Sequence, residues 1–137
     1  MRIFLMLLCC LLMVACAYTQ QSGMREDFEK QMKDYNRMLR WQEMEQAGML
    51  YLAPELRESF MKGAESARKR GITITDYRII TSECTPKQKK ATAVVLFEYY
   101  TLPSNRIKSL TYYQDWFYGN TIEIKGWKLK SQLPPFE

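Results

Sequence analysis

Aromatic side chains between Phe97 and Tyr118 are the residues best placed to form a binding site. Eight aromatic residues fall in this stretch, some of them consecutive, so both faces of an extended strand carry them. Exposed aromatic surface on a sheet is typical of an interface. Aromatic residues in strands also reflect β propensity and cross-strand pairing, and the sequence leaves both interpretations open. The candidate interface or pocket residues are Tyr99, Tyr112, Tyr113, Asp115, Trp116, Tyr118 and Trp127.

Few groups in this chain could support catalysis. It contains no histidine, which excludes Ser-His and Cys-His nucleophiles, imidazole proton transfer and histidine metal sites. Glu98 and Asp115 have the chemical type of a general base. Tyr99 and Tyr112 have that of an oxyanion donor. The sequence has no paired acids, metal-ligand cluster, phosphate-binding glycine loop or nucleophile elbow, so we predict a binding domain without catalysis, cofactor or metal.

The first 15 residues, MRIFLMLLCCLLMVA, predict a signal peptide. One cation, Arg2, precedes an apolar run of 13 residues that ends at Ala15. A bilayer core requires roughly 20 apolar residues, so this run is short for a membrane span. A charged start, a short apolar run and small residues after it are typical of a secretory signal.

Cys16 is the residue whose position predicts a covalent modification. The string Leu12-Met13-Val14-Ala15-Cys16 resembles the bacterial lipobox, although Met13 stands where leucine is usual. Lipid would then be attached to the Cys16 thiol, and Cys16 would become the mature N-terminus. The alternative is cleavage before Tyr18, after an A-x-A-like site, which would remove Cys16. We favour lipidation, because a cysteine this close to an apolar run followed by polar residues is otherwise hard to explain.

The chain therefore divides into a signal peptide (1–15), a lipidated N-terminus and tether (16–26) and a single domain (27–137). A flexible tether of about ten residues spans about 17 Å on average, which would keep the domain close to the membrane. Ala17 replaces the aspartate that retains enterobacterial lipoproteins in the inner membrane. This position indicates the outer membrane of a bacterial envelope, facing the periplasm.

The mature chain has only one cysteine besides Cys16, namely Cys84. An intramolecular disulfide is thereby excluded, and we predict a packing role for Cys84. Without Arg2, 19 Lys and Arg oppose 15 Asp and Glu, a modest excess, and nucleic acid is not an expected partner of an exported protein. The expected partners are membrane lipid through Cys16 and an envelope protein or a second copy through the sheet. A small amphipathic ligand is the alternative.

Helical spacing of apolar residues predicts one long helix over residues 27–51. Gly48 marks a break in it or a close approach of another element. Pro54 opens a second helix, which ends at Gly71 after a basic last turn. The apolar stripe of the first helix includes Phe28, Met32, Tyr35 and Leu39.

After Gly71 the hydrophobic period changes to two, which predicts four strands. Short connections between them predict an antiparallel meander. A run of helices followed by strands indicates an α+β fold, in which a curved sheet wraps around the helices. The predicted strands cover residues 72–84, 91–101, 106–118 and 123–133.

This pattern resembles the nuclear transport factor two-like superfamily of cone-shaped α+β domains, over nearly all of residues 27–136. The resemblance implies a sheet of about four strands packed on the helices. Within this superfamily the chain is similar to small bacterial lipoproteins, most of which have no assigned activity. The superfamily also hosts isomerases, hydrolases, carriers and dimerising scaffolds, so the fold does not select a function, and an enzyme of this fold is a further alternative. The resembling features are Tyr35 and Trp41 in the first helix, the Pro54-initiated second helix, the strand Tyr112–Trp116 and the terminal strand Gly126–Ser131.

Overall fold

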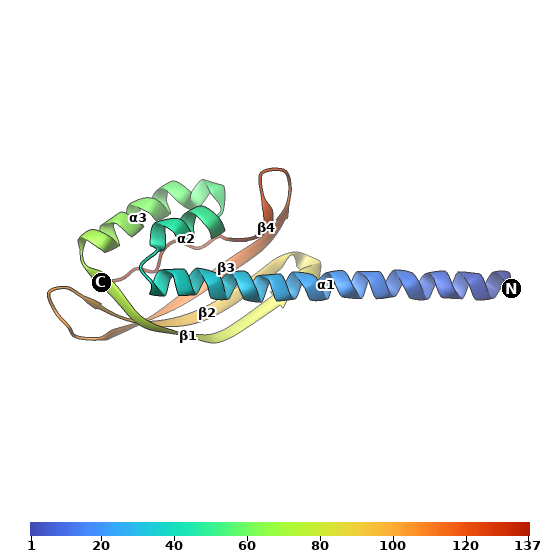
Figure 1. Ribbon diagram of the computed structural model, residues 1–137, viewed down its shortest axis with the longest axis horizontal. Helices are drawn as coiled ribbons and strands as arrows, with labels where there is room; N and C mark the ends of the chain where they lie inside the picture. The colour runs from blue at the N-terminus through green and yellow to red at the C-terminus, as the bar shows by residue number, and fades with distance from the viewer.

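The computed structural model describes residues 1–137, with the side chain of Arg2 left out of the description. Helices occupy the first half of the chain and strands the second half, as the sequence predicts (Figure 1). The helices are α1 (Arg2–Arg40), α2 (Met44–Tyr51) and α3 (Arg57–Lys69), with short 3-10 turns at Pro54–Leu56 and Pro86–Gln88. The strands are β1 (Ile72–Thr85), β2 (Lys90–Thr101), β3 (Lys108–Asn120) and β4 (Lys125–Leu129).

The four strands form one antiparallel sheet in the order β1-β2-β3-β4, which confirms the predicted meander. The sheet is open rather than closed into a barrel. The three helices lie over one of its faces, and the opposite face carries no helix (Figure 1). The α+β fold, with a long N-terminal helix, further helices and a four-stranded antiparallel sheet, is therefore confirmed.

Helix α1 is longer than the sequence predicts, because residues 16–26 are helical where we expected a flexible tether. This segment contains no proline, and its one glycine, Gly23, costs a helix only about 1 kcal/mol relative to alanine. At 1.5 Å per residue, the 39 residues of α1 extend about 58 Å. About half of the helix therefore projects beyond the sheet (Figure 1).

The predicted helix over residues 27–51 is interrupted between Arg40 and Met44. Gln42 adopts a left-handed conformation with φ of 66°. Gln42 N–H donates to Leu39 O at 3.1 Å and Glu43 N–H donates to Met38 O at 2.9 Å, the bonding pattern of a Schellman helix end. The sequence hides this end, since glutamine stands where glycine is usual.

The close approach predicted for Gly48 is present. A Cβ at this position would lie 2.5 Å from Cδ1 of Phe60 on α3, so only glycine lets the two helices pack this tightly. At the end of α3 the chain turns into β1 at Gly71, whose φ of 72° favours glycine.

The core lies between α1 and the concave face of the sheet. Residues Phe28, Met32, Tyr35 and Leu39 of α1 are all buried, which confirms the predicted stripe. The inward face of β2 consists of Ala91, Ala93, Val95, Phe97 and Tyr99, all buried. Phe136 returns near the C-terminus and packs its ring 4.9 Å from that of Tyr99, edge to face.

Candidate functional site

The candidate interface residues do not share one surface, because strand alternation divides them between the two faces of the sheet. Tyr113 is 71% exposed and Asp115 is also exposed, so both lie on the outer face. Tyr118 is half-buried, with its ring centroid 5.4 Å from that of Trp127. The remaining candidates are buried on the inner face: Tyr99, Tyr112, Trp116 and Trp127.

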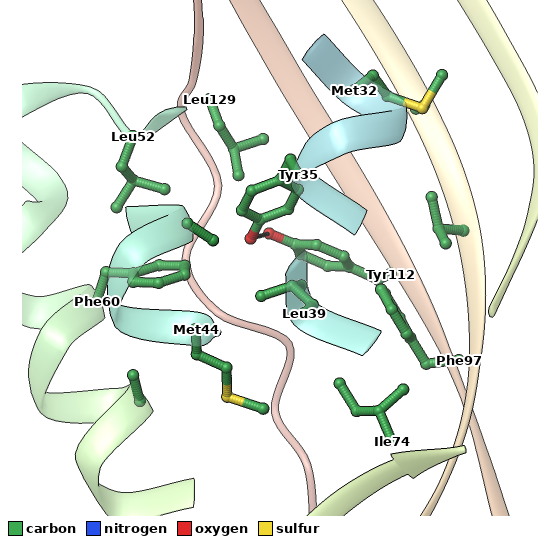
Figure 2. Close-up of a cluster of buried hydrophobic side chains, with 14 of the residues drawn as sticks. Met32, Tyr35, Leu39, Met44, Leu52, Phe60, Ile74, Phe97, Tyr112 and Leu129 are labelled. Atoms are coloured by element: carbon green, nitrogen blue, oxygen red, sulfur yellow. Dashed lines mark hydrogen bonds between the residues drawn. The ribbon is translucent and has the colours of Figure 1, made fainter. Parts of the chain in front are cut away.

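Tyr112 belongs to a buried hydrogen-bond chain with Tyr35. Its hydroxyl donates to the carbonyl oxygen of Gln132 at 2.7 Å, and the two tyrosine hydroxyls lie 3.2 Å apart (Figure 2). A phenol has one proton to donate, so Tyr35 is the donor to Tyr112. Burial raises the pKa of both phenols, that of Tyr35 further through its neighbour Tyr112. Both groups are therefore neutral at physiological pH and bonded to protein atoms.

A second buried polar cluster joins α1 to β3, and the sequence analysis missed it. Asn36 is fully buried and Gln114 is 1% exposed. Gln114 Nε2 donates to Asn36 Oδ1 at 2.7 Å, and Trp116 Nε1 donates to Gln114 Oε1 at 3.2 Å. Asn36 Nδ2 donates to Met32 O at 2.8 Å and lies 3.4 Å from Gln114 Oε1. The only sequence signal was polar residues at inward positions of two apolar stripes.

Trp127 fixes α1 against the edge of the sheet. Its indole Nε1 donates to the carbonyl oxygen of Met24 at 2.8 Å. Its ring lies 5.4 Å from the ring of Phe28, one helical turn further along α1. Trp127 is thus a core residue that positions the middle of α1, and its side chain is fully buried.

The outer face of the sheet presents a mixed apolar and polar surface. Tyr113 pairs with Val94 across the strands, and Leu96 lies two residues further along β2. Val94 and Leu96 are half-buried although no helix covers this face. Four residues further along β3, the ammonium of Lys130 lies 4.9 Å from the centre of the Phe117 ring, a cation–π contact.

The sheet separates the acids from the phenols that an acid–base mechanism would need together. Glu98 alternates with buried Phe97 and Tyr99, so Glu98 points to the same outer face as Asp115. Tyr99 and Tyr112 are buried on the inner face. Among the side chains that the structure describes, no group of three or more acids or cysteines could hold a metal ion.

Cys84 lies half-buried on β1, near the turn into β2. Burial raises the pKa of its thiol, and Glu29 raises it further against an opposing effect of Arg25. The thiol is therefore protonated and weakly nucleophilic at neutral pH.

The segment of α1 from Ile3 to Ala15 is apolar on every side and projects beyond the sheet (Figure 1). Ile3, Phe4 and Leu5 are 78%, 75% and 65% exposed, and Val14 is 70% exposed. By length and composition this helix could cross a membrane, although a signal sequence passes the same test. Cys16 is exposed near the end of the apolar segment.

Comparison with known proteins leaves this chain without a family. No protein-family model matches it, and no curated protein matches its sequence. Among solved structures it is similar to the intermembrane space region of the chloroplast protein ARC6, with a TM-score of 0.48 and 12% identity, over 73% of this chain and 92% of that one. So distant a likeness carries no function, and the resemblance to the nuclear transport factor two-like superfamily stays a prediction.

Proposed function

We propose that the protein is an exported lipoprotein, anchored through Cys16 to the outer membrane of a bacterial envelope, whose domain is a non-catalytic protein-interaction module. The observation that carries this proposal is the exposed apolar segment of α1, residues 3–14, which ends two residues before an exposed cysteine. In water such a segment is unfavourable at about 25 cal/mol per Å² of apolar surface, so it requires lipid or removal by a signal peptidase.

The partner-binding surface of this domain is the outer face of the sheet, centred on Tyr113. The helices cover the opposite face, so a partner can reach this one. Tyrosine is one of the residues enriched at protein interfaces, and Tyr113 is exposed on this face. The inward candidates contribute to packing instead, because their polar atoms bond to other atoms of the domain.

Fractionation of cells that express Cys16→Ser tests the anchor. The unmodified chain should sediment with membranes and label with radioactive palmitate, and the variant should lose the label and appear in the soluble fraction. Cys84→Ser is the matched control and should behave as the unmodified chain does. A Cys16→Ser protein that stays in the membrane at unchanged size would refute lipidation and identify the apolar helix as the anchor.

Site-specific photo-crosslinking tests the interaction surface. A photoreactive phenylalanine analogue at Tyr113 should give a discrete crosslinked species in cells. The same analogue at Met49, which is 56% exposed on α2, is the matched control on the helical layer. Crosslinks from position 49 with none from position 113 would refute the assignment of the interaction to the sheet.

A further inference from the structure

The direction in which α1 crosses the sheet determines which end of the domain lies nearest the apolar segment of α1. The guanidinium of Arg40 donates to Ile74 O at 3.0 Å, near the start of β1. Arg25 of α1 shares a surface hollow with residues 82–85, at the end of β1. Helix α1 therefore runs antiparallel to β1, and its N-terminal half leaves the domain at the end where β1 turns into β2 (Figure 1).

Two connections lie at this end of the sheet. In an antiparallel meander, the β1–β2 and β3–β4 connections share one end, and the β2–β3 connection lies at the other. The β3–β4 loop is tied to α1 as well, because Trp127 of β4 bonds to Met24 O at 2.8 Å. Several residues of these two connections are exposed, and we call five of them the rim: Lys87, Lys89, Lys90, Ile122 and Lys125.

The rim combines lysine side chains with one exposed aliphatic side chain. The β1–β2 turn carries three exposed lysines and no acid between Thr85 and Lys90. In the β3–β4 loop, Ile122 is 98% exposed and makes almost no contact with the domain. Glu123 offsets the charge of Lys125 in that loop, so the excess of positive charge lies on the β1–β2 turn.

The distance from the rim to the anchor is short. Nine residues separate Cys16 from Arg25, and all of them are helical, so the two lie about 13 Å apart along α1. The headgroup layer of a bilayer is about 5–8 Å thick on each side, and lysine side chains extend their charge toward polar surroundings. With Cys16 at the base of this layer and α1 upright, about 5–8 Å separates the level of Arg25 from the top of the headgroups, a gap that an extended lysine side chain of the turn can span.

We propose that the rim docks on the surface of a bilayer that contains anionic phospholipids, with the turn lysines reaching the phosphates and Ile122 facing the headgroup surface. This inference rests on the proposed membrane anchor, and it adds a defined orientation of the domain. Each lysine held at an anionic surface strengthens docking about fivefold, so the three turn lysines together contribute about a hundredfold. The electrostatic part weakens as salt concentration rises.

Hydrogen exchange of the full chain, purified from membranes of a bacterial host and reconstituted into vesicles, tests this docking. One set of vesicles contains phosphatidylcholine alone, and the other contains phosphatidylcholine mixed with phosphatidylglycerol. Amides of residues 87–90 and 120–125 should exchange several-fold more slowly on the anionic vesicles. Lys87→Gln with Lys89→Gln and Lys90→Gln should return this exchange to its rate on neutral vesicles, and Ile122→Ser should reduce the protection of its own loop.

The β2–β3 loop is a matched control, because it carries Arg106 and the 52% exposed Ile107 at the opposite end of the sheet. Its amides should exchange equally on both vesicles, and Arg106→Gln with Ile107→Ser should leave the rim protected. Rim exchange that is equal on both vesicles, or equal protection of the β2–β3 loop, would overturn the docking while leaving the anchor intact. A chain that alkaline carbonate removes from both vesicles would refute the anchor itself.

Discussion

Replacing Gln114 with methionine tests whether the buried amide pair of α1 and β3 is structural. Methionine has a similar length and volume but cannot accept a hydrogen bond from an amide or an indole with comparable strength. In Gln114→Met, Asn36 Oδ1 loses its donor at 2.7 Å and Trp116 Nε1 loses its acceptor at 3.2 Å. Asn36 Nδ2 keeps its bond to Met32 O at 2.8 Å.

The expected loss in the free energy of unfolding follows from the number of buried polar atoms that each substitution leaves without a hydrogen-bond partner. Each buried polar group that loses its partner costs about 1–3 kcal/mol, so two such groups destabilise the fold by about 2–6 kcal/mol. Asn36→Leu leaves Gln114 Nε2 without its acceptor and costs about 1–3 kcal/mol by the same rule. The double variant leaves only the Trp116 indole unpaired. Its destabilisation should therefore fall below the sum of the single costs by two such groups, at least about 2 kcal/mol.

Urea unfolding, followed by the fluorescence of the buried tryptophans, measures these free energies by linear extrapolation. Gln132→Met is the matched control, because its side chain is exposed and bonds only to Ser59 Oγ at 2.7 Å. This control should change stability by no more than about 0.5 kcal/mol. A cost below about 1 kcal/mol for Gln114→Met, or additive single costs, would refute the structural role and point to a polar site reserved for a ligand.

Three further predictions address packing and ionisation. Gly48→Ala should destabilise the domain by about 1–3 kcal/mol in the same assay, since its Cβ would lie 2.5 Å from the Phe60 ring; Gly63→Ala, with its nearest neighbour 3.7 Å away, should be tolerated. Burial raises the pKa of Tyr35 and Tyr112 above that of an unfolded tyrosine. Their contribution to the free energy of unfolding is therefore fully present below pH ~10, and above that pH it falls by about 1.4 kcal/mol per pH unit for each tyrosine that ionises in the unfolded chain. Alkaline unfolding should therefore be less steep in the variant Tyr35→Phe with Tyr112→Phe, and equal profiles would contradict the buried pair. With the other cysteines replaced by serine, Cys84 should react with iodoacetamide at pH 8 more slowly in the folded chain than in urea, because burial raises its pKa.

Local signals predicted most of the fold. Strand alternation placed Ala93, Val95, Phe97 and Tyr99 on one buried face, and the structure confirms it. Short connections predicted the meander, and the strands begin and end within four residues of the predicted positions. The prediction of a buried apolar stripe on α1 from Phe28 to Leu39 is also confirmed. These predictions succeed because periodicity and turn chemistry are properties of neighbouring residues.

Two helix boundaries could not be predicted, because each depends on distant residues. Gln42 ends α1 in a left-handed conformation, and with its amide oriented to match donors with acceptors it bonds to the backbone of Ile72 and Ile74 on β1. Residues 16–26 are helical partly because Trp127, over a hundred positions away, holds Met24. Neither partner is recognisable from the local sequence.

The candidate site was predicted by residue type but not by the face of the sheet. Six of the seven candidates are aromatic, and alternation within β3 should have divided those on that strand, since Tyr112 and Trp116 share one face and Tyr113 lies on the other. The sequence did not give the register of β3 against β2. That register pairs Tyr112 with Val95 and so places it on the buried face of the sheet.

The continuity of α1 determines how a lipid anchor would present the sheet. Its first 15 residues form an exposed, largely apolar segment, its C-terminal half packs along the strands, and the helix is continuous between the two. With Cys16 at the bilayer and α1 upright, the strands run away from the membrane, and the outer face of the sheet faces sideways. A partner embedded in or bound to the same membrane can then meet Tyr113 at a fixed height. A flexible tether would lack this geometry, since about ten disordered residues sample distances around 17 Å in all directions. The rigid helix thus favours partners held at the membrane over soluble ones.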